Sequence, residues 1–343
     1  MTQAVLSKGA GNSREVVHSA ALRFRRGAAS DLERCAEILP RGFRAPSRVM
    51  HNLIPVWSRL IASAAHTFAV VEDLEGRHPA NIEGFGLSVF VTRRFVDRFC
   101  ASPRPYLASY FYEQVLEGEE IVVTKEQVPN ANAASSLNVL VLHFGLANED
   151  LSDSRTAQVL MAGSSAFYFF HAGYRIDTLL NEVYGLQPRQ YMERGGFRLM
   201  HDFHREQPGD FEGVPPEQHP YLFLLRGAWM EPGVIHPLSQ LFAPPLPRFG
   251  FSASERRVLE GALLNESDGQ IAVRLGISPD GIKKLWRNVY QRASREMPGL
   301  IPEPGQTLPG SRGQEKRRHL LEYLRLHLEE LRPAPVRTKP KVR

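Results

Sequence analysis

Cysteine is scarce in this sequence, since its 343 residues include only Cys35 and Cys100. Two cysteines are too few for a disulfide framework, so both are interpreted as buried thiols in a reducing compartment. Long apolar runs are missing too, because no stretch approaches the roughly 18 consecutive apolar residues of a membrane helix. Residues 1–21 also contain no apolar segment long enough for a signal peptide. The sequence therefore predicts a cytoplasmic protein without a membrane partner.

Well-known catalytic motifs are missing as well. The sequence has no P-loop, no Gly-x-Ser-x-Gly turn and no Cys-x-x-Cys pair. His201 and His204 flank Asp202, but residues three apart in a strand point to opposite faces, which does not favour a metal site. His171 follows a run of aromatic residues and is interpreted as a core histidine. We therefore predict no enzyme, no catalytic residue, no metal and no cofactor, and we assign no cofactor-binding residue.

The net formal charge of +5 is unevenly distributed. Residues 1–248 carry 24 basic and 26 acidic side chains, whereas residues 249–343 carry 18 basic and 11 acidic ones. The C-terminal quarter thus holds the whole positive excess. This asymmetry favours a polyanionic partner at that end of the chain, although a solvated basic tail explains it as well.

Local composition divides the chain into five segments. Prolines are frequent between residues 208 and 247, and Pro244–Pro247 is typical of a semi-rigid spacer. We predict a flexible leader (1–20), a mixed α/β sensor-like domain (21–207), a Pro-rich connecting region (208–248), a helix-turn-helix domain (249–297), and a C-terminal helix with a basic tail (298–343). The expected fold class is α+β, with an α/β part followed by an all-α part.

Hydrophobic patterns predict the elements of the α/β domain. Runs rich in β-branched and aromatic residues predict strands at Leu22–Arg26, Thr67–Glu72, Glu83–Thr92, Leu137–Leu146 and Phe197–Phe203. Helical spacing of apolar residues predicts helices at Leu32–Leu39, Val49–Ile61, Tyr106–Leu116, Ser154–Tyr174 and Ile176–Leu186. The apolar run Tyr221–Trp229 interrupts the Pro-rich region and is expected to pack on this domain.

Residues 251–296 carry the start and stop signals of three helices. Ser252 or Ser254 can cap the first helix, Ser267 the second and Ser278 the third. Gly276 permits the positive φ that ends a helix sharply. The third helix has an apolar side, spaced three and four apart, that consists of Ile282, Leu285, Trp286 and Val289.

The opposite side of the third helix is basic and bears side-chain amides. Such a helix fits the major groove of DNA, where Lys and Arg bond guanine and Asn and Gln bond adenine. Its charges also attract phosphates. The sequence therefore predicts a DNA-binding surface made of Ser278, Lys283, Lys284, Arg287, Asn288, Gln291 and Arg292. A plain three-helix unit with a solvated charged face is the alternative interpretation.

This segment resembles the LuxR-type helix-turn-helix of bacterial regulators. The features that match are Ser254–Leu259, Gln270–Ser278 and Ile282–Lys283. The resemblance implies that Lys283, Lys284 and Arg287 read bases and that the second helix crosses the DNA backbone. Gly281 departs from the family, which usually has Thr or Ser there, and it costs the helix up to about 1 kcal/mol relative to alanine.

The α/β domain is open to several interpretations. Its strand–helix opening at Arg23–Leu39, its paired central strands and its closing string Tyr191–Arg198 resemble GNAT-type N-acyltransferases. The resemblance implies a cofactor loop of the form Arg/Gln-x-x-Gly-x-Gly/Ala after a strand, with backbone amides that face the pyrophosphate. No such loop follows Glu83–Thr92, so acyl-CoA activity is not expected even on this fold.

Three other classes were compared with these patterns. In a PAS- or GAF-like sensor, the aromatic residues of Phe167–Tyr174 would line a pocket for a small molecule instead of filling the core. A receiver domain needs clustered carboxylates at strand ends, which the N-terminal part does not show. A sigma-factor-like promoter reader would need a second helical domain, which the β-rich half argues against.

Together these patterns predict a LuxR-type transcription regulator that binds double-stranded DNA as a homodimer through its C-terminal domain. The N-terminal domain would sense a small molecule or self-associate. The alternative is an acyl-CoA-dependent N-acyltransferase with an accessory helical domain.

Overall fold

A seven-stranded mixed sheet forms the centre of the N-terminal part. The computed structural model describes residues 21–76, 81–229, 238–302 and 312–333. Across the sheet the strands follow the order β1-β2-β3-β4-β5-β7-β6, and all neighbours are antiparallel except β4 and β5, which are parallel. The strands are β1 Leu22–Arg26, β2 His66–Asp73, β3 Ile82–Val91, β4 Leu137–Leu146, β5 Ile176–Tyr184, β6 Arg198–Asp202 and β7 Pro220–Arg226. This architecture confirms the predicted mixed α/β part.

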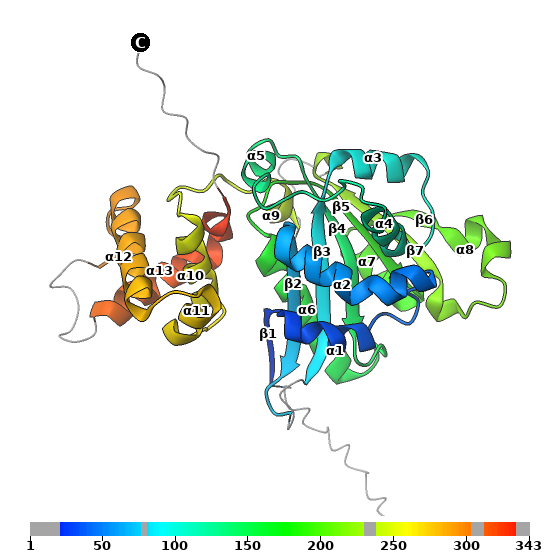
Figure 1. Ribbon diagram of the computed structural model, residues 1–343, viewed down its shortest axis with the longest axis horizontal. Helices are drawn as coiled ribbons and strands as arrows, with labels where there is room; N and C mark the ends of the chain where they lie inside the picture. The colour runs from blue at the N-terminus through cyan, green and yellow to red at the C-terminus, as the bar shows by residue number, and fades with distance from the viewer. Residues whose placement is uncertain (1–20, 77–80, 230–237, 303–311, 334–343) are drawn as a thin grey trace, which may run out of the picture.

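Helices pack on both faces of the sheet (Figure 1). Side chains along β3 point alternately to the two faces of the sheet. Ser88 bonds His171 of α6 on one face, and the ring of Phe85 contacts Trp57 of α2 on the other. The parallel pair needs a crossover, which α6 provides between β4 and β5. The helices of this part are α1 Leu32–Glu37, α2 Ser47–Ser63, α3 Arg93–Ala101, α4 Leu107–Leu116, α5 Val128–Ala133, α6 Ser154–His171, α7 Leu186–Arg194 and α8 Phe203–Glu206.

Two predictions about this part are wrong. The helix predicted at Ile176–Leu186 is strand β5, which pairs with β4 on one edge and with β7 on the other. Its apolar residues fit a helical period, but pairing on both edges overrides that local signal. The region predicted to connect the domains contributes β7 to the sheet, so the α/β part extends beyond residue 207.

The C-terminal helices form where the sequence predicts them. Ser252, Ser267 and Ser278 each accept a hydrogen bond from a backbone N–H in the first turn that follows. Gly276 ends the second helix with a φ of 64°. The helices are α10 Ala253–Leu263, α11 Asp268–Leu275, α12 Pro279–Glu296 and α13 Arg312–Leu326, preceded by the short α9 Ser239–Phe242. The predicted leader and the tail Arg337–Arg343 lie outside the described residues.

Apolar residues of α13 and of the turn that follows it pack inward. Leu320, Leu324 and Leu331 are buried in one cluster with residues of α10 and α12. No helix among the described residues is both long enough and apolar enough to cross a membrane.

The helical part is attached at the end of the sheet where β5 begins. The buried guanidinium of Arg332 donates to the carbonyl oxygens of Phe169 (2.6 Å) and Ala172 (2.7 Å) at the end of α6. On β1, Nε of Arg26 donates to Oε1 of Glu260 in α10 at 3.1 Å. Among the described residues, these contacts lie at the end of the sheet opposite the carboxyl ends of β4 and β5.

A buried hydrogen-bond chain joins α2, α4 and β4. Nε1 of Trp57 donates to the Tyr112 hydroxyl oxygen at 2.7 Å, and that hydroxyl lies 2.8 Å from Nε2 of His143. Burial lowers the pKa of His143 to about 3. The imidazole is therefore neutral near pH 7, and its Nε2 can accept the tyrosine proton.

Tyr112→Phe should lower the free energy of unfolding by about 1–3 kcal/mol, because Trp57 and His143 each lose a buried partner. Urea unfolding of the purified chain measures this loss. Tyr110→Phe on the same helix is the matched control and should change the free energy little, since the described residues supply no hydrogen bond to the Tyr110 hydroxyl. Equal stability of the two variants would show that the Trp57–Tyr112–His143 hydrogen-bond chain does not stabilise the fold.

Arg332→Met should lower the free energy of unfolding by about 2 kcal/mol, since two carbonyls of α6 lose a charged donor. Hydrogen exchange should rise in residues 312–333 before it rises in the sheet. The exposed Arg325 of α13 provides the control, and Arg325→Met should leave both quantities unchanged. Unaltered exchange in the Arg332 variant would show that this contact does not hold the helical part.

Candidate active site

The parallel strands β4 and β5 separate part-way along their length. Their last paired residues are Val141 and Asn181, and within the described sheet they do not pair with each other beyond this point. Their outer edges stay paired, β4 with β3 as far as Leu146 and β5 with β7 as far as Tyr184. The two inner edges therefore offer backbone groups that strand pairing does not use. This opening lies at the carboxyl ends of the parallel strands, where ligands of α/β sheets commonly bind.

A β-bulge coincides with the separation. Leu87 of β3 lies opposite His143 and Ser88 lies opposite Val141, so Leu142 is an extra residue on β4. A bulge bends its strand and increases the local twist, and this directs β4 away from β5. The next residue along β4 is His143, which the chain through Tyr112 fixes in place.

A carboxyl group stands on β5 immediately after the last paired residue. The two oxygens of Glu182 accept hydrogen bonds from the backbone N–H groups of Tyr106 (2.8 Å) and Leu107 (2.6 Å), where α4 begins. The Tyr184 hydroxyl is a further hydrogen-bond partner. Burial raises the pKa of Glu182 to about 7, although these hydrogen bonds oppose the shift. Glu182 can thus release or accept a proton near neutral pH.

The same hydrogen bonds hold Tyr106 in an unusual conformation. Its φ is 65°, in the left-handed region that residues with a side chain rarely occupy. Such strain persists where surrounding contacts determine it, and it is frequent at functional sites. Here the Glu182 carboxyl supplies those contacts and fixes the direction of the Tyr106 ring, which lies 6.5 Å from the ring of Tyr184.

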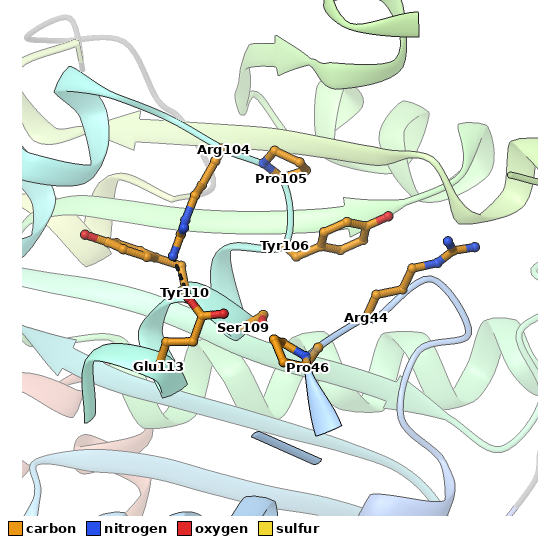
Figure 2. Close-up of a pocket in the computed structure, with 9 residues that line it drawn as sticks. Arg44, Pro46, Arg104, Pro105, Tyr106, Ser109, Tyr110 and Glu113 are labelled. Atoms are coloured by element: carbon orange, nitrogen blue, oxygen red, sulfur yellow. Dashed lines mark hydrogen bonds and ion pairs between the residues drawn. The ribbon is translucent and has the colours of Figure 1, made fainter. Parts of the chain in front are cut away.

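A pocket of about 350 Å³ opens beside Tyr106. The loop between α1 and α2 contributes Arg44 to it, and the start of α4 contributes Tyr106 and Tyr110. Figure 2 shows Arg104 reaching Glu113 beside the Tyr110 ring, with Tyr106 and Arg44 on the other side. The Arg104–Glu113 distance is 2.6 Å, and the Arg104 guanidinium lies 4.2 Å from the centre of the Tyr110 ring. The pocket thus combines aromatic faces with paired charges.

The histidines singled out in the sequence lie elsewhere. His171 is buried, and its two ring nitrogens bond Ser88 (2.8 Å) and the Phe167 carbonyl (2.7 Å), which confirms it as a core residue. Burial lowers its pKa to about 4. His201 pairs with Glu206, whereas His204 is helical and does not share that contact.

The loop from β4 to α6, residues 147–153, begins at the opening. Asp150 accepts hydrogen bonds from the backbone and the hydroxyl of Ser152, at 2.9 and 2.6 Å. Asp153 caps α6 by accepting from the backbone N–H of Thr156 at 2.8 Å. Glu149 accepts from the backbone N–H of Arg41 at 2.8 Å. The first turn of α6 is thus surrounded by carboxylates of the chain itself.

The residues predicted to bind DNA do not all share one surface. Lys283, Lys284, Arg287 and Gln291 are exposed on α12, and Asn288 is half-buried beside them. Ser278 caps this helix through its hydroxyl, as predicted. Arg292 departs from the prediction, because it turns towards α10, where its Nε lies 3.5 Å from the Glu255 carboxylate. The other positions remain untested as binding residues.

Comparisons with known proteins found acetyltransferase structures that resemble this chain at low similarity. No family model matches the chain, and no curated protein matches it. A mosquito arylalkylamine N-acetyltransferase like 5b is 10% identical with a TM-score of 0.35, and the match covers 60% of this chain and 99% of that one. A SpeG spermidine/spermine N-acetyltransferase from Vibrio cholerae (mutant forms) is 12% identical with a TM-score of 0.31, and the match covers 60% of this chain and 94% of that one. A NatC complex bound to Gag peptide and CoA is 8% identical with a TM-score of 0.31, and the match covers 60% of this chain and 98% of that one.

These comparisons contradict the predicted function. The resembling structures are N-acetyltransferases and a CoA complex, so the predictions of a DNA-binding transcription regulator, of a DNA partner and of a protein that is not an enzyme are wrong. The predicted homodimer stays untested. At this low similarity the comparisons concern the fold of the N-terminal part, and its activity depends on the arrangement of the site described above.

The sequence resemblance to GNAT-type N-acyltransferases implies coenzyme A, and the loop that would hold its pyrophosphate does not fit that group. A phosphate at the carboxyl ends of the parallel strands would bind at the start of α6, with backbone amides free to donate. Residues 147–153 contain no glycine, and the chain's own carboxylates accept from those amides instead. The sequence predicted the position of such a loop after β3, whereas the strand that separates at the opening is β4.

Sequence reasoning missed Glu182, Tyr106 and the opening itself. The signal for Glu182 is a polar Asn181–Glu182 pair that follows the apolar Leu179–Leu180 within the strand. That signal becomes visible only when residues 176–184 are assigned as a strand. The contact with Tyr106 spans 76 positions of sequence, which no local pattern predicts.

The pKa of Glu182 makes stability depend on pH. Its folded pKa of about 7 exceeds the ordinary 4.5, so the folded chain binds the proton more tightly than the unfolded one. This contribution is complete below about pH 4.5 and is lost as the pH rises through 7, a change of about 3 kcal/mol. Urea unfolding at several pH values should show this loss in the wild type and not in Glu182→Gln. Glu117→Gln should retain the wild-type profile, and a similar profile in both variants would contradict the assignment.

Proposed function

We propose that the protein transfers an acyl group from a thioester to an amine at the opening between β4 and β5. The observation that carries the proposal is the coincidence of the bulge at Leu142 with the end of β4–β5 pairing at Val141 and Asn181. An extended arm that contains amide groups can bond to such a backbone edge as an added strand does. A thioester at the end of that arm would lie beside the bulge.

The groups around the opening suit the chemistry of acyl transfer. The amine nitrogen forms a bond to the thioester carbonyl carbon, the carbon–sulfur bond breaks, and the products are an amide and a thiol. The nitrogen must lose one proton and the leaving sulfur takes one up. Glu182 is the candidate proton acceptor, because its pKa of about 7 lies near the operating pH. Backbone N–H groups at the bulge are candidate donors to the carbonyl oxygen.

The pocket beside Tyr106 is the candidate site for the amine. Aromatic faces attract ammonium groups, and Tyr106 presents one to the pocket, whereas the Arg104 guanidinium already lies over the Tyr110 ring. The Glu113 carboxylate lies on the wall nearest Tyr110, where it is paired with Arg104. Tyr106 also connects this pocket to Glu182 through its own backbone N–H.

Glu182→Gln tests the proposed proton acceptor. With S-acetylpantetheine or acetyl-CoA as donor and a panel of aromatic and aliphatic amines, release of free thiol should fall about 100-fold at pH 8. The wild-type rate should rise with pH and reach half its maximum near pH 7, as Glu182 ionises. Glu117→Gln, at the far end of α4, should retain the wild-type rate. An unchanged rate in the Glu182 variant would remove Glu182 from the mechanism, and no amine-dependent thiol release with either donor would reject the proposed function.

We also infer that the C-terminal helices have the LuxR-type helix-turn-helix architecture. The support consists of three helices with Ser caps at Ser252, Ser267 and Ser278, and of the sharp end of α11 at Gly276. This inference concerns architecture alone and includes no DNA partner.

A further inference from the structure

We propose that the acyl donor of this site is a thioester on a pantetheine-type arm that carries no diphosphate at the start of α6. The proposal rests on the acyl transfer proposed above and names the class of its donor. Its basis is that the loop between β4 and α6 already supplies the anions that a nucleotide donor would bring.

Several backbone donors of this loop already have acceptors within the protein. Besides the amides of Ser152 and Thr156, the N–H of Asp150 donates to the Asn148 side chain at 3.0 Å. The N–H of Asp153 donates to the Asp150 carbonyl at 3.1 Å. A diphosphate at this position would have to displace carboxylate or carbonyl acceptors of the same turn. These acceptors belong to the protein and lose no entropy of association when they bond, whereas a bound diphosphate does.

The cations near the loop are also engaged. Arg155, in the first turn of α6, pairs with Asp73 at 2.5 Å and with Glu83 at 3.4 Å. Arg41 lies 3.8 Å from Glu149. Within the described residues these two arginines contact carboxylates around the start of α6, so the loop presents net negative charge to an incoming phosphate.

Charged side chains of the protein itself lie at both ends of the α6 helix dipole. Hydrogen bonds from the Ser152 and Thr156 groups lower the pKa values of Asp150 and Asp153, so both are ionised at neutral pH. They lie at the positive end of the helix, whereas Arg332 donates to carbonyls at its negative end. The helix dipole, which binds phosphate in many nucleotide sites, is therefore already used.

The residues at which β4 and β5 separate carry no formal charge. Val141 and Leu142 on β4 and Asn181 on β5 border it, and the Asn181 amide contacts the sulfur of Met192 at 3.7 Å. An arm with amide groups and no charge suits these edges, because it can bond to backbone groups without meeting the carboxylates of residues 149–153.

Calorimetric titration of the full chain at low ionic strength tests the donor class. The two probes are S-acetylpantetheine and acetyl-CoA, which share the thioester arm and differ in the phosphorylated nucleotide. We expect S-acetylpantetheine to bind at least about tenfold more tightly than acetyl-CoA. The difference should shrink as salt is added, because salt screens the repulsion between the loop and the phosphates.

A charge-removed variant locates the cause. Glu149→Gln, Asp150→Asn and Asp153→Asn together keep side-chain oxygens that can accept the loop hydrogen bonds, and they remove three negative charges. This variant should bind acetyl-CoA about tenfold more tightly than the wild type and S-acetylpantetheine equally well. Asp97→Asn, Asp280→Asn and Glu322→Gln together form the matched control and should leave both affinities unchanged.

The outcomes separate this inference from the proposed function. If the wild type binds acetyl-CoA as tightly as S-acetylpantetheine, the donor inference is wrong while acyl transfer stands. If neither probe binds at any salt concentration, both are wrong. If the triple variant does not fold, the salt dependence of the wild-type affinities tests the role of the loop instead. A preference for S-acetylpantetheine that does not change with salt would overturn that role.

Discussion

One extra residue on β4 sets the geometry on which the candidate site depends. With Leu142 inserted opposite β3, β4 cannot follow β5 beyond Val141, and the two parallel strands separate where an unbulged pair would continue. The chain from Trp57 through Tyr112 to His143 fixes the strand on the far side of the bulge. Rigid elements thus hold an unpaired backbone edge in place, which is what precise positioning of a ligand requires.

Electrostatics adds a second constraint at the same end of the sheet. Burial brings the pKa of Glu182 close to neutrality, whereas hydrogen bonds from the loop keep Asp150 and Asp153 ionised. Carboxyl groups on adjoining elements therefore take different roles, because burial outweighs the hydrogen bonds at Glu182, whereas hydrogen bonds dominate at Asp150 and Asp153. The first can move a proton, and the others decide which ligands are repelled.

Local signals in the sequence predicted what local interactions determine. The caps at Ser252, Ser267 and Ser278 and the turn at Gly276 involve neighbouring residues only, and each lies where it was predicted. Strand β5 could not be assigned, since its apolar residues fit a helical period and only pairing with β4 and β7 makes it a strand. The candidate site could not be predicted from the sequence, because the bulge, Glu182 and the start of α4 come together only in the folded sheet. A basic face on a helix is also compatible with more than one function, and here it suggested a DNA partner that the comparisons contradict.

The position of α6 has a mechanical consequence. Its first turn borders the opening, and its last turn is clamped by the guanidinium of Arg332. An α-helix is stiff along its axis, so a displacement of the clamp would be transmitted as a rigid-body movement to the far end. The C-terminal helices, although remote from the opening, are thus connected to it through α6, and a displacement of Arg332 would act on the first turn of this helix.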